Sequence, residues 1–482
     1  MFKYLVFNIL ILLPILAFSQ QETPISDANN KYGFIERDSA LPATIIIQTI
    51  ELEGNKKTKE RIILRELGLK AGDTISTADI DYRLLWVKNR IFNTALFLKV
   101  DLNLTGPDSV LKTLYITVKE RFYSYPIPYG DLADRNFNEW WQDRNHDLSR
   151  IDVGIDYRQK NIRGRNETLK LKAITGFNNK IEFSYNIPYI DKKLKTGLTI
   201  ITNFLTSRQV AYETLENKLV YFENNSVARE KLTSGFILSR RNNFYVTHQL
   251  GLTYNYNFIA DTVAKLNPDF FLNGKDAQQY LSLKYTYTND HRDYVYYPLK
   301  GTLLKVETEA LGLGISKDIT FYNLRVESAY FLPLSKKFFF AVGLRAKTSY
   351  PRVQPYANER GLGYNQEWVS GYERYVINGQ HYGLLKTNLK LKLFSKEFQT
   401  KILPNSKFRT IPLIIYLKMH NDFGYVVDNT YDPNNYRLVN TLLWGGGLGL
   451  DMITYYDIVF RVEYSVNRDL QRGFFFNLKA PI

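Results

Sequence analysis

The fold class is decided by Leu281-Ser282-Leu283-Lys284-Tyr285-Thr286-Tyr287-Thr288. Every odd-numbered position in this stretch is apolar or aromatic, and every even-numbered position is polar. Successive side chains of a β-strand point to opposite faces, so a period of two predicts a strand with one apolar and one polar face. From about residue 150 onward the same alternation recurs, for example in Leu169 to Ala173, Leu389 to Leu393 and Ile458 to Ser465.

The charges on the polar faces separate two fold classes. A soluble sandwich also shows a period of two, but its sheets enclose a dry core. Here lysines such as Lys170 and Lys390 follow one face of long strands, and Arg461 shares a face with Glu463. An aromatic share of 15% suits the aromatic girdles of a membrane barrel. We therefore expect a mainly β protein with a transmembrane antiparallel β-barrel over residues 150–482.

Turn signals divide this region into about eleven strands before a long connection at 350–381 and about five after it. The total of about sixteen is even, as bacterial barrels require. The long connections at 259–277, 350–381 and 428–436 are expected on the extracellular side, because periplasmic turns are short.

The first 43 residues are expected to precede the folded domains and to comprise two segments. Lys3 provides a positive start, Tyr4 to Phe18 form an apolar run, and Ala17-Phe18-Ser19 is typical of a cleavage site, which predicts a signal peptide over residues 1–19. Residues 20–43 are polar and are predicted to be a flexible lead. No later stretch has 18 consecutive apolar residues, so a membrane crossing requires a barrel.

Residues 44–122 have the pattern of a small α+β domain with the order β-α-α-β-β. Its second helix carries Ile80, Leu84, Val87 and Ile91 on one face. Residues 123–149 contain Tyr125-Pro126-Ile127-Pro128 and the pair Trp140-Trp141, and we interpret them as a hinge. The hinge lies either at a membrane interface or packed on the preceding domain, and the sequence does not distinguish the two.

Composition excludes several kinds of site. Cysteine is absent, which removes disulfides and thiolate metal ligands, and the five histidines are isolated. No nucleophile elbow or phosphate-binding loop occurs, so we expect neither an enzyme nor a cofactor. The net charge of +15 allows anionic partners, and lipopolysaccharide phosphates or a polar lumen suit an exported chain better than nucleic acid. A solvated surface with an excess of cations and no partner fits the charge equally well.

Several motifs resemble a known family. Gly54-Asn55, Arg65-Glu66-Leu67 and Gly72-Asp73 resemble a POTRA domain, a periplasmic module thought to bind client strands by edge pairing, although a simple spacer would also fit. Together with the barrel they are similar to the BamA/TamA family of outer-membrane assembly factors. The barrel signature of that family is matched by Asp290, Arg292, Asp293, Pro298 and Gly301.

The resemblance extends to the long connection and to the last strands. Val369-Ser370-Gly371-Tyr372 is similar to a lumen-loop motif whose second residue is usually arginine, and Asp422 with Gly424 is similar to its barrel-wall partner. Because Ser370 replaces the arginine, Arg374 is a candidate to pair with Asp422. Gly446 to Asp451, Tyr455-Tyr456-Asp457 and the closing Gly473 to Phe476 resemble the C-terminal strands.

The resemblance implies a mechanism without catalytic groups. A short seam between the first strand, near Ile151, and the last strand, with Gly473, Phe474 and Phe476, would open sideways and template unfolded client proteins. The implied role is an insertase for outer-membrane proteins, and the missing arginine and single POTRA-like unit suggest a specialised or accessory paralogue. A dedicated translocator and a structural subunit that works with accessory partners remain alternatives.

Overall fold

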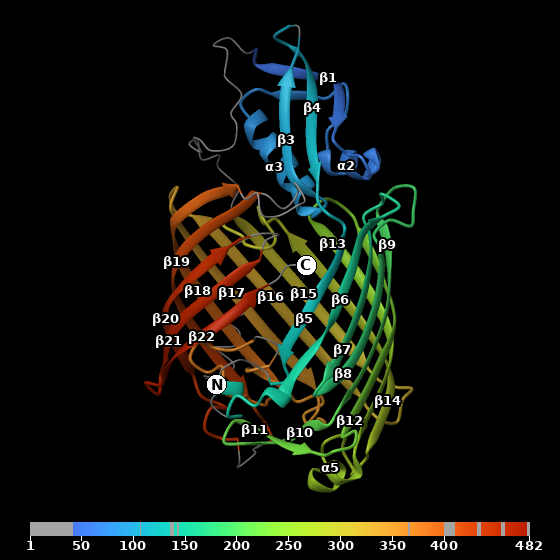
Figure 1. Cartoon of the computed structure of the whole chain (residues 1–482), viewed down its shortest axis with the longest axis vertical. Helices are drawn as coiled ribbons and strands as arrows, with labels where there is room; N and C mark the ends of the chain where they lie inside the picture. The colour runs from blue at the N-terminus through green and yellow to red at the C-terminus, as the bar shows by residue number, and fades with distance from the viewer. Residues whose placement is uncertain are drawn as a thin grey trace.

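The computed structural model describes residues 42–106, 108–134, 139–141, 144–364, 367–399, 410–430, 435–454 and 458–479. The predicted signal peptide, almost all of the predicted flexible lead and the motif Tyr455-Tyr456-Asp457 lie outside the described residues. None of the helices in these ranges is long and apolar enough to cross a membrane. Figure 1 shows a large barrel of strands with a small domain at one open end.

The small N-terminal domain is a four-stranded sheet covered by two helices. Its elements are β1 Thr44–Glu53, α2 Glu60–Leu67, β2 Thr74–Ser76, α3 Ile80–Asn93, β3 Phe97–Thr105 and β4 Leu111–Glu120. The sheet order is β2-β1-β4-β3, and β1 pairs with β4 in parallel. The predicted order lacked only the three-residue strand β2. The buried face of α3 consists of the four apolar residues that its helical spacing predicted.

The barrel is a single antiparallel sheet of sixteen strands. In chain order the strands are β5 Ser124–Leu132, β6 Ile151–Ile162, β7 Glu167–Gly176, β8 Asn178–Ile187, β9 Thr196–Ser207, β12 Arg229–Arg241, β13 Val246–Ile259, β14 Ala277–Asp290, β15 Gly301–Leu311, β16 Phe321–Pro333, β17 Phe338–Tyr350, β18 His381–Gln399, β19 Thr410–Val427, β20 Leu443–Ile453, β21 Val459–Asn467 and β22 Arg472–Lys479. Eleven precede the long connection and five follow it, which confirms the predicted architecture.

One boundary was wrong. The first barrel strand is β5, which lies in the segment predicted to be a hinge, so Ile151 begins the second strand and is not at the seam. The prolines in this stretch are compatible with a strand because β5 is at an edge of the sheet. On the open side of an edge strand, a missing N–H group removes no hydrogen bond to a neighbouring strand.

Strand alternation produces an apolar outer surface and a polar lumen. On β14, Leu281, Leu283 and Tyr285 are exposed, while Ser282 and Thr286 are buried inside the barrel. This arrangement is expected for strands between lipid and a polar interior.

The end of the barrel away from the N-terminal domain carries most of the additional structure. There lie the hairpin of β10 Gln209–Leu215 and β11 Lys218–Glu223, the helix α5 Asp261–Leu266 and the connection 351–380 (Figure 1). A short 3-10 helix, η2 Leu148–Arg150, precedes β6. The hairpin was not predicted, because its strands have the same period of two as the barrel strands.

Candidate functional site

The connection between β17 and β18 folds into the barrel and packs on its inner wall. Val369 and Tyr372 are only 1% and 2% exposed, and they belong to an apolar cluster with Leu384 on β18 and Val426 on β19. The segment that carries the sequence motif is therefore a docked lumen loop, which we define as residues 351–380.

Asp422 on β19 binds both the lumen loop and the wall. The Ser370 hydroxyl donates to its Oδ2 at 2.6 Å, and the Ser370 N–H donates to the same oxygen at 3.2 Å. The Lys386 ammonium lies 3.0 Å from that oxygen. Sequence reasoning proposed Arg374 as this cation; the structure gives the ion pair to Lys386, because Lys386 lies directly opposite Asp422 in the β18–β19 ladder.

Glycines allow the lumen loop to approach the wall closely. Gly371 has a φ of +82°, a conformation that favours glycine, and its carbonyl accepts a hydrogen bond of 2.8 Å from Asn467. A side chain at Gly424 would collide with Val369, and one at Gly445 would collide with the Ser370 carbonyl. The inner wall therefore has no side chains at the two positions where the loop motif packs most closely against it.

The barrel-signature residues form the turn between β14 and β15, next to the N-terminal domain. Arg292 pairs with Asp290 at 2.6 Å, and Gly301 has a φ of +107° at the start of β15. Asp293 accepts hydrogen bonds from two backbone N–H groups, of Tyr294 at 2.8 Å and of Leu299 at 3.1 Å. Burial raises the pKa of the Asp293 carboxyl, while these N–H groups oppose the shift.

The same turn inserts a side chain into the barrel. Tyr297, which precedes the half-buried Pro298, donates to Asp451 at 2.9 Å, and Asp451 also accepts from Arg461 at 2.7 Å. The Tyr297 ring lies 5.1 Å from the ring of Tyr416 on β19. The signature thus fixes a side-chain cluster at the end of the lumen nearest the N-terminal domain.

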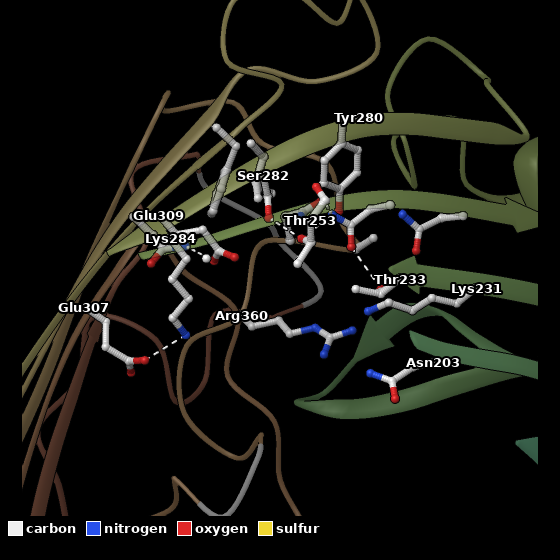
Figure 2. Close-up of a pocket in the computed structure, with 18 of the residues that line it drawn as sticks. Asn203, Lys231, Thr233, Thr253, Tyr280, Ser282, Lys284, Glu307, Glu309 and Arg360 are labelled. Atoms are coloured by element: carbon white, nitrogen blue, oxygen red, sulfur yellow. Dashed lines mark hydrogen bonds and ion pairs between the residues drawn. The ribbon is translucent and has the colours of Figure 1, made fainter. Parts of the chain in front are cut away.

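A polar cavity of about 730 Å³ lies between the lumen loop and the strands from β8 to β17. Figure 2 shows Arg360 reaching from the loop into this space, with its guanidinium turned toward the ammonium of Lys231 on β12. Thr233 and Asn203 line the same side of the cavity. Glu307 on the opposite wall pairs with Lys284 at 2.7 Å.

The two ends of the sheet are β5 and β22. Within the described residues β5 pairs only with β6, and β22 pairs only with β21. This places the seam at β5 and β22, and Gly473, Phe474 and Phe476 lie on β22 as the seam prediction required.

The backbone of β5 lacks two donors on its seam side. Lys160 N–H donates to the Tyr123 carbonyl at 2.7 Å, and Ala133 N–H donates to the Arg150 carbonyl at 2.8 Å. Backbone groups of successive residues in an antiparallel pair point to opposite sides, so the odd-numbered residues of β5 bond to β6 and the even-numbered ones face the seam. Pro126 and Pro128 are even-numbered and have no N–H.

The backbone of β22 has its donors on the seam side. Asn467 N–H donates to the Gln471 carbonyl at 2.9 Å, which by the same alternation directs Arg472, Phe474, Phe476 and Leu478 away from β21. None of these residues is proline. The two edges of the seam therefore differ in their capacity to donate backbone hydrogen bonds.

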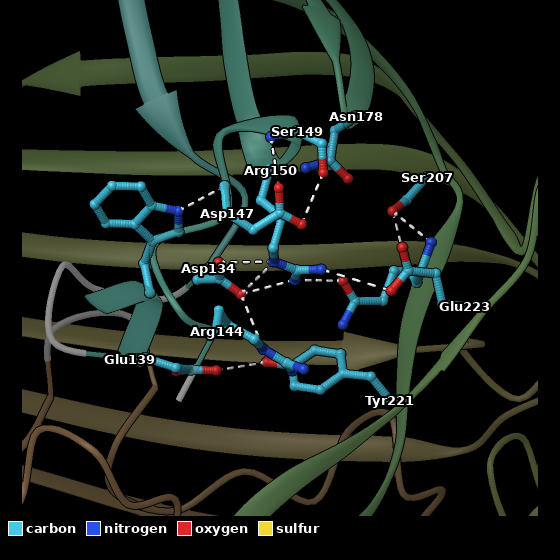
Figure 3. A network of polar contacts seen from close by, with 12 residues as sticks. Asp134, Glu139, Arg144, Asp147, Ser149, Arg150, Asn178, Ser207, Tyr221 and Glu223 are labelled. Atoms are coloured by element: carbon cyan, nitrogen blue, oxygen red, sulfur yellow. Dashed lines mark hydrogen bonds and ion pairs between the residues drawn. The ribbon is translucent and has the colours of Figure 1, made fainter. Parts of the chain in front are cut away.

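A buried network fixes the segment that follows β5 (Figure 3). Arg150, 4% exposed, pairs with Asp134 at 2.7 Å and donates to Gln209 on the β10–β11 hairpin at 2.6 Å. Tyr221 on the same hairpin donates to Glu139 at 3.1 Å. The connection from β5 to β6 is thus attached to the hairpin at the far end of the barrel, beside the seam strand.

The N-terminal domain docks on turns of the barrel. Glu66 on α2 is 1% exposed and accepts a bidentate pair from Arg241 on β12 at 2.7 and 2.9 Å. Arg90 on α3 stacks over the Phe244 ring at 4.0 Å. These contacts hold the domain at the mouth of the barrel.

Comparison with family models gives two matches. A model described as Omp85 superfamily domain matches residues 161–477, more than half of the chain. A POTRA model, described as surface antigen variable number repeat, matches residues 45–121. The comparison with curated proteins finds no match.

Two solved structures share the fold at low sequence identity. BamA from Haemophilus ducreyi lacking POTRA domains 1–3 is 14% identical with a TM-score of 0.50, and the match covers 90% of this chain and 83% of that one. CdiB from Escherichia coli is 13% identical with a TM-score of 0.55, and the match covers 90% of this chain and 76% of that one.

Proposed function

The chain belongs to the Omp85 superfamily, and from this premise we propose that it is an outer-membrane insertase that assembles client β-strands at the β5–β22 seam. The observation that carries the proposal is that β5 and β22 are the two edge strands of the sheet. Among the described residues, each of them is hydrogen-bonded to one neighbouring strand only. An edge strand is a template for another extended chain, and a client that pairs there keeps its backbone groups satisfied while it enters lipid.

The two edge strands of the seam differ in their backbone N–H donors, and this difference indicates which of them a client strand pairs with first. Pro126 and Pro128 remove two donors from the β5 edge, so complete closure of β5 on β22 is weakened. The β22 edge directs the N–H groups of Arg472, Phe474 and Leu478 toward the seam. We therefore assign the first pairing of a client strand to β22.

The lumen is obstructed near both ends, which favours insertion over passage through the barrel. The docked lumen loop and the Tyr297 cluster occupy the interior from both ends, and each is held by buried contacts. A translocator would have to displace this packing for each substrate, whereas an insertase uses the seam and leaves these contacts in place.

The proposed setting is the outer membrane of a Gram-negative-type bacterium, with the POTRA domain in the periplasm and unfolded outer-membrane proteins as clients. The Lys386–Asp422 pair replaces the arginine pairing implied by the family motif, which supports a specialised or accessory role.

Depletion of the protein followed by outer-membrane proteomics tests the proposal. Reduced levels of many barrel proteins are expected for an insertase. Loss of one surface or secreted protein would instead identify a dedicated translocator, and an unchanged profile would indicate a structural subunit.

A further inference from the structure

The lumen cavity beside the loop has a large excess of positive charge. Eight basic side chains line it against two glutamates, Glu307 and Glu309; the basic residues are Lys180, Arg229, Lys231, Lys284, Lys305, Arg325, Lys347 and Arg360. Lys284 and Lys305 share Glu307 at 2.7 and 3.1 Å, and Lys180 pairs with Glu182. Lys347 donates to the Arg360 carbonyl at 2.7 Å.

Besides Lys347, whose ammonium is bonded to a carbonyl, four lining cations have no carboxylate at ion-pair distance in the part of the chain that the structure describes. They are Arg229 and Lys231 on β12, Arg325 on β16 and Arg360 on the lumen loop. The Arg325 Nε is buried and has no hydrogen-bond partner. Arg229 and Lys231 are two residues apart on one strand, so their side chains point to the same side.

The arrangement brings like charges together. Figure 2 shows the Arg360 guanidinium and the Lys231 ammonium turned toward each other across the cavity. Two cations that share an enclosed space repel each other. The Arg360 guanidinium also lies 5.3 Å from the centroid of the Tyr364 ring, but this cation–π contact does not neutralise its charge. An oxyanion between them would accept charge-assisted hydrogen bonds from both.

We propose that this cavity is a binding site for a phosphate-bearing ligand. The charges of Arg229, Lys231, Arg325 and Arg360 together match a group with several negative charges, such as a diphosphate, better than a monocarboxylate. Arginine provides planar, forked donors that fit phosphate oxygens, and Lys231 adds a point charge. Asn203 and Thr233 supply neutral polar groups in the same wall. The ligand also attaches the lumen loop to β12, because Arg360 and Lys231 come from these two elements.

The proposal is tested by calorimetric titration of the full chain, folded in detergent micelles, with sodium pyrophosphate. We expect one site whose affinity decreases as salt is raised. The double substitution K231Q/R360Q should weaken binding at least tenfold. The matched pair K317Q/K336Q removes the same charge from exposed turns and should leave binding unchanged.

A second variant keeps the test valid if the double variant folds poorly. Lys231→Glu places a carboxylate where Arg360 can pair with it, so K231E should fold and yet lose pyrophosphate binding. Heat-modifiable gel mobility reports folding of each variant. Absence of wild-type binding at millimolar pyrophosphate, or unchanged binding by K231E, would overturn the site.

Competition identifies the source of the phosphate group. Displacement of pyrophosphate by equimolar glucose 1-phosphate supports a phosphorylated sugar, such as a lipid headgroup carries. Displacement by inorganic phosphate but not by the sugar phosphate supports a free phosphate.

Discussion

The Ser370 hydroxyl donates a hydrogen bond of 2.6 Å to the Asp422 carboxylate. Lys386, the neighbour of Asp422 across the β18–β19 ladder, supplies the positive charge at 3.0 Å. The loop therefore contributes only a neutral hydroxyl group. The negative charge of Asp422 is balanced by Lys386, which belongs to the barrel wall. The family motif instead implies an arginine carried by the loop.

The first prediction concerns the partner of Asp422. A double-mutant cycle on Lys386→Met and Asp422→Asn should give a coupling of about 0.5–3 kcal/mol, because the two groups share an ion pair. The cycle on Arg374→Met and Asp422→Asn should be additive within about 0.5 kcal/mol. Guanidinium unfolding in detergent micelles measures both, and strong coupling only to Arg374 would contradict the assignment to Lys386.

The second prediction concerns loop docking. Gly445→Ala introduces a methyl group against the Ser370 carbonyl, so we expect a loss of about 1–3 kcal/mol and faster proteolysis of the lumen loop. Gly343→Ala is the matched control. A methyl group added there would lie 3.8 Å from its nearest neighbour, the Ser328 carbonyl oxygen, and would therefore not collide with it. Equal protease resistance of the two variants would show that the loop does not depend on this contact.

How far the sequence predicts the structure depends on whether a feature is local. The approximate number of strands and most of their positions were predictable, because each strand between lipid and lumen has its own alternation, as in Leu281 to Thr288. Strand β5 was missed because its two prolines are typical of linkers, although Tyr125, Ile127 and Tyr129 keep a period of two. A proline is harmless on the open side of an edge strand, and the sequence does not mark which strand is the edge.

The contacts of the candidate site were less predictable. Lys386 was missed because its pairing follows from the β18–β19 register, which links residues 36 positions apart. The motif Val369 to Tyr372 located the loop, but the glycines that receive it lie on β19 and β20. The cluster of Arg229, Lys231 and Arg360 combines a strand and a loop whose proximity arises only when the barrel closes.

The third prediction concerns docking of the POTRA domain. Arg241→Gln leaves Glu66 buried with Arg65, at 2.6 Å, as its one ion-pair partner among the described residues. We expect the domain to become mobile, because breaking a buried pair costs far more than breaking an exposed one. Spin labels at Glu51→Cys and Lys336→Cys are unique in this cysteine-free chain. Their narrow distance distribution should broaden in R241Q and remain narrow in the exposed control R240Q.

The fourth prediction concerns the prolines of β5. The double substitution P126T/P128T restores two N–H donors on the seam side, so β5 should pair more completely with β22. Amide hydrogen exchange in residues 472–479 should slow, and client insertion should fall. Pro333→Thr on β16 is the control for a proline replaced away from the seam. Unchanged exchange in the double variant would contradict the assigned direction of the β5 backbone.

The central claim, that clients enter through the β5–β22 seam, is tested most directly by locking the seam with a disulfide. Gly130 on β5 has space for a side chain, and Phe474 and Phe476 on β22 face outward, so G130C can be combined with F474C or F476C. The combination that oxidises fully is then compared in its oxidised and reduced forms, in cells depleted of the wild-type protein. We predict that the oxidised lock reduces the levels of many outer-membrane barrel proteins and that a reductant restores them. Normal levels with the seam fully locked would contradict lateral entry.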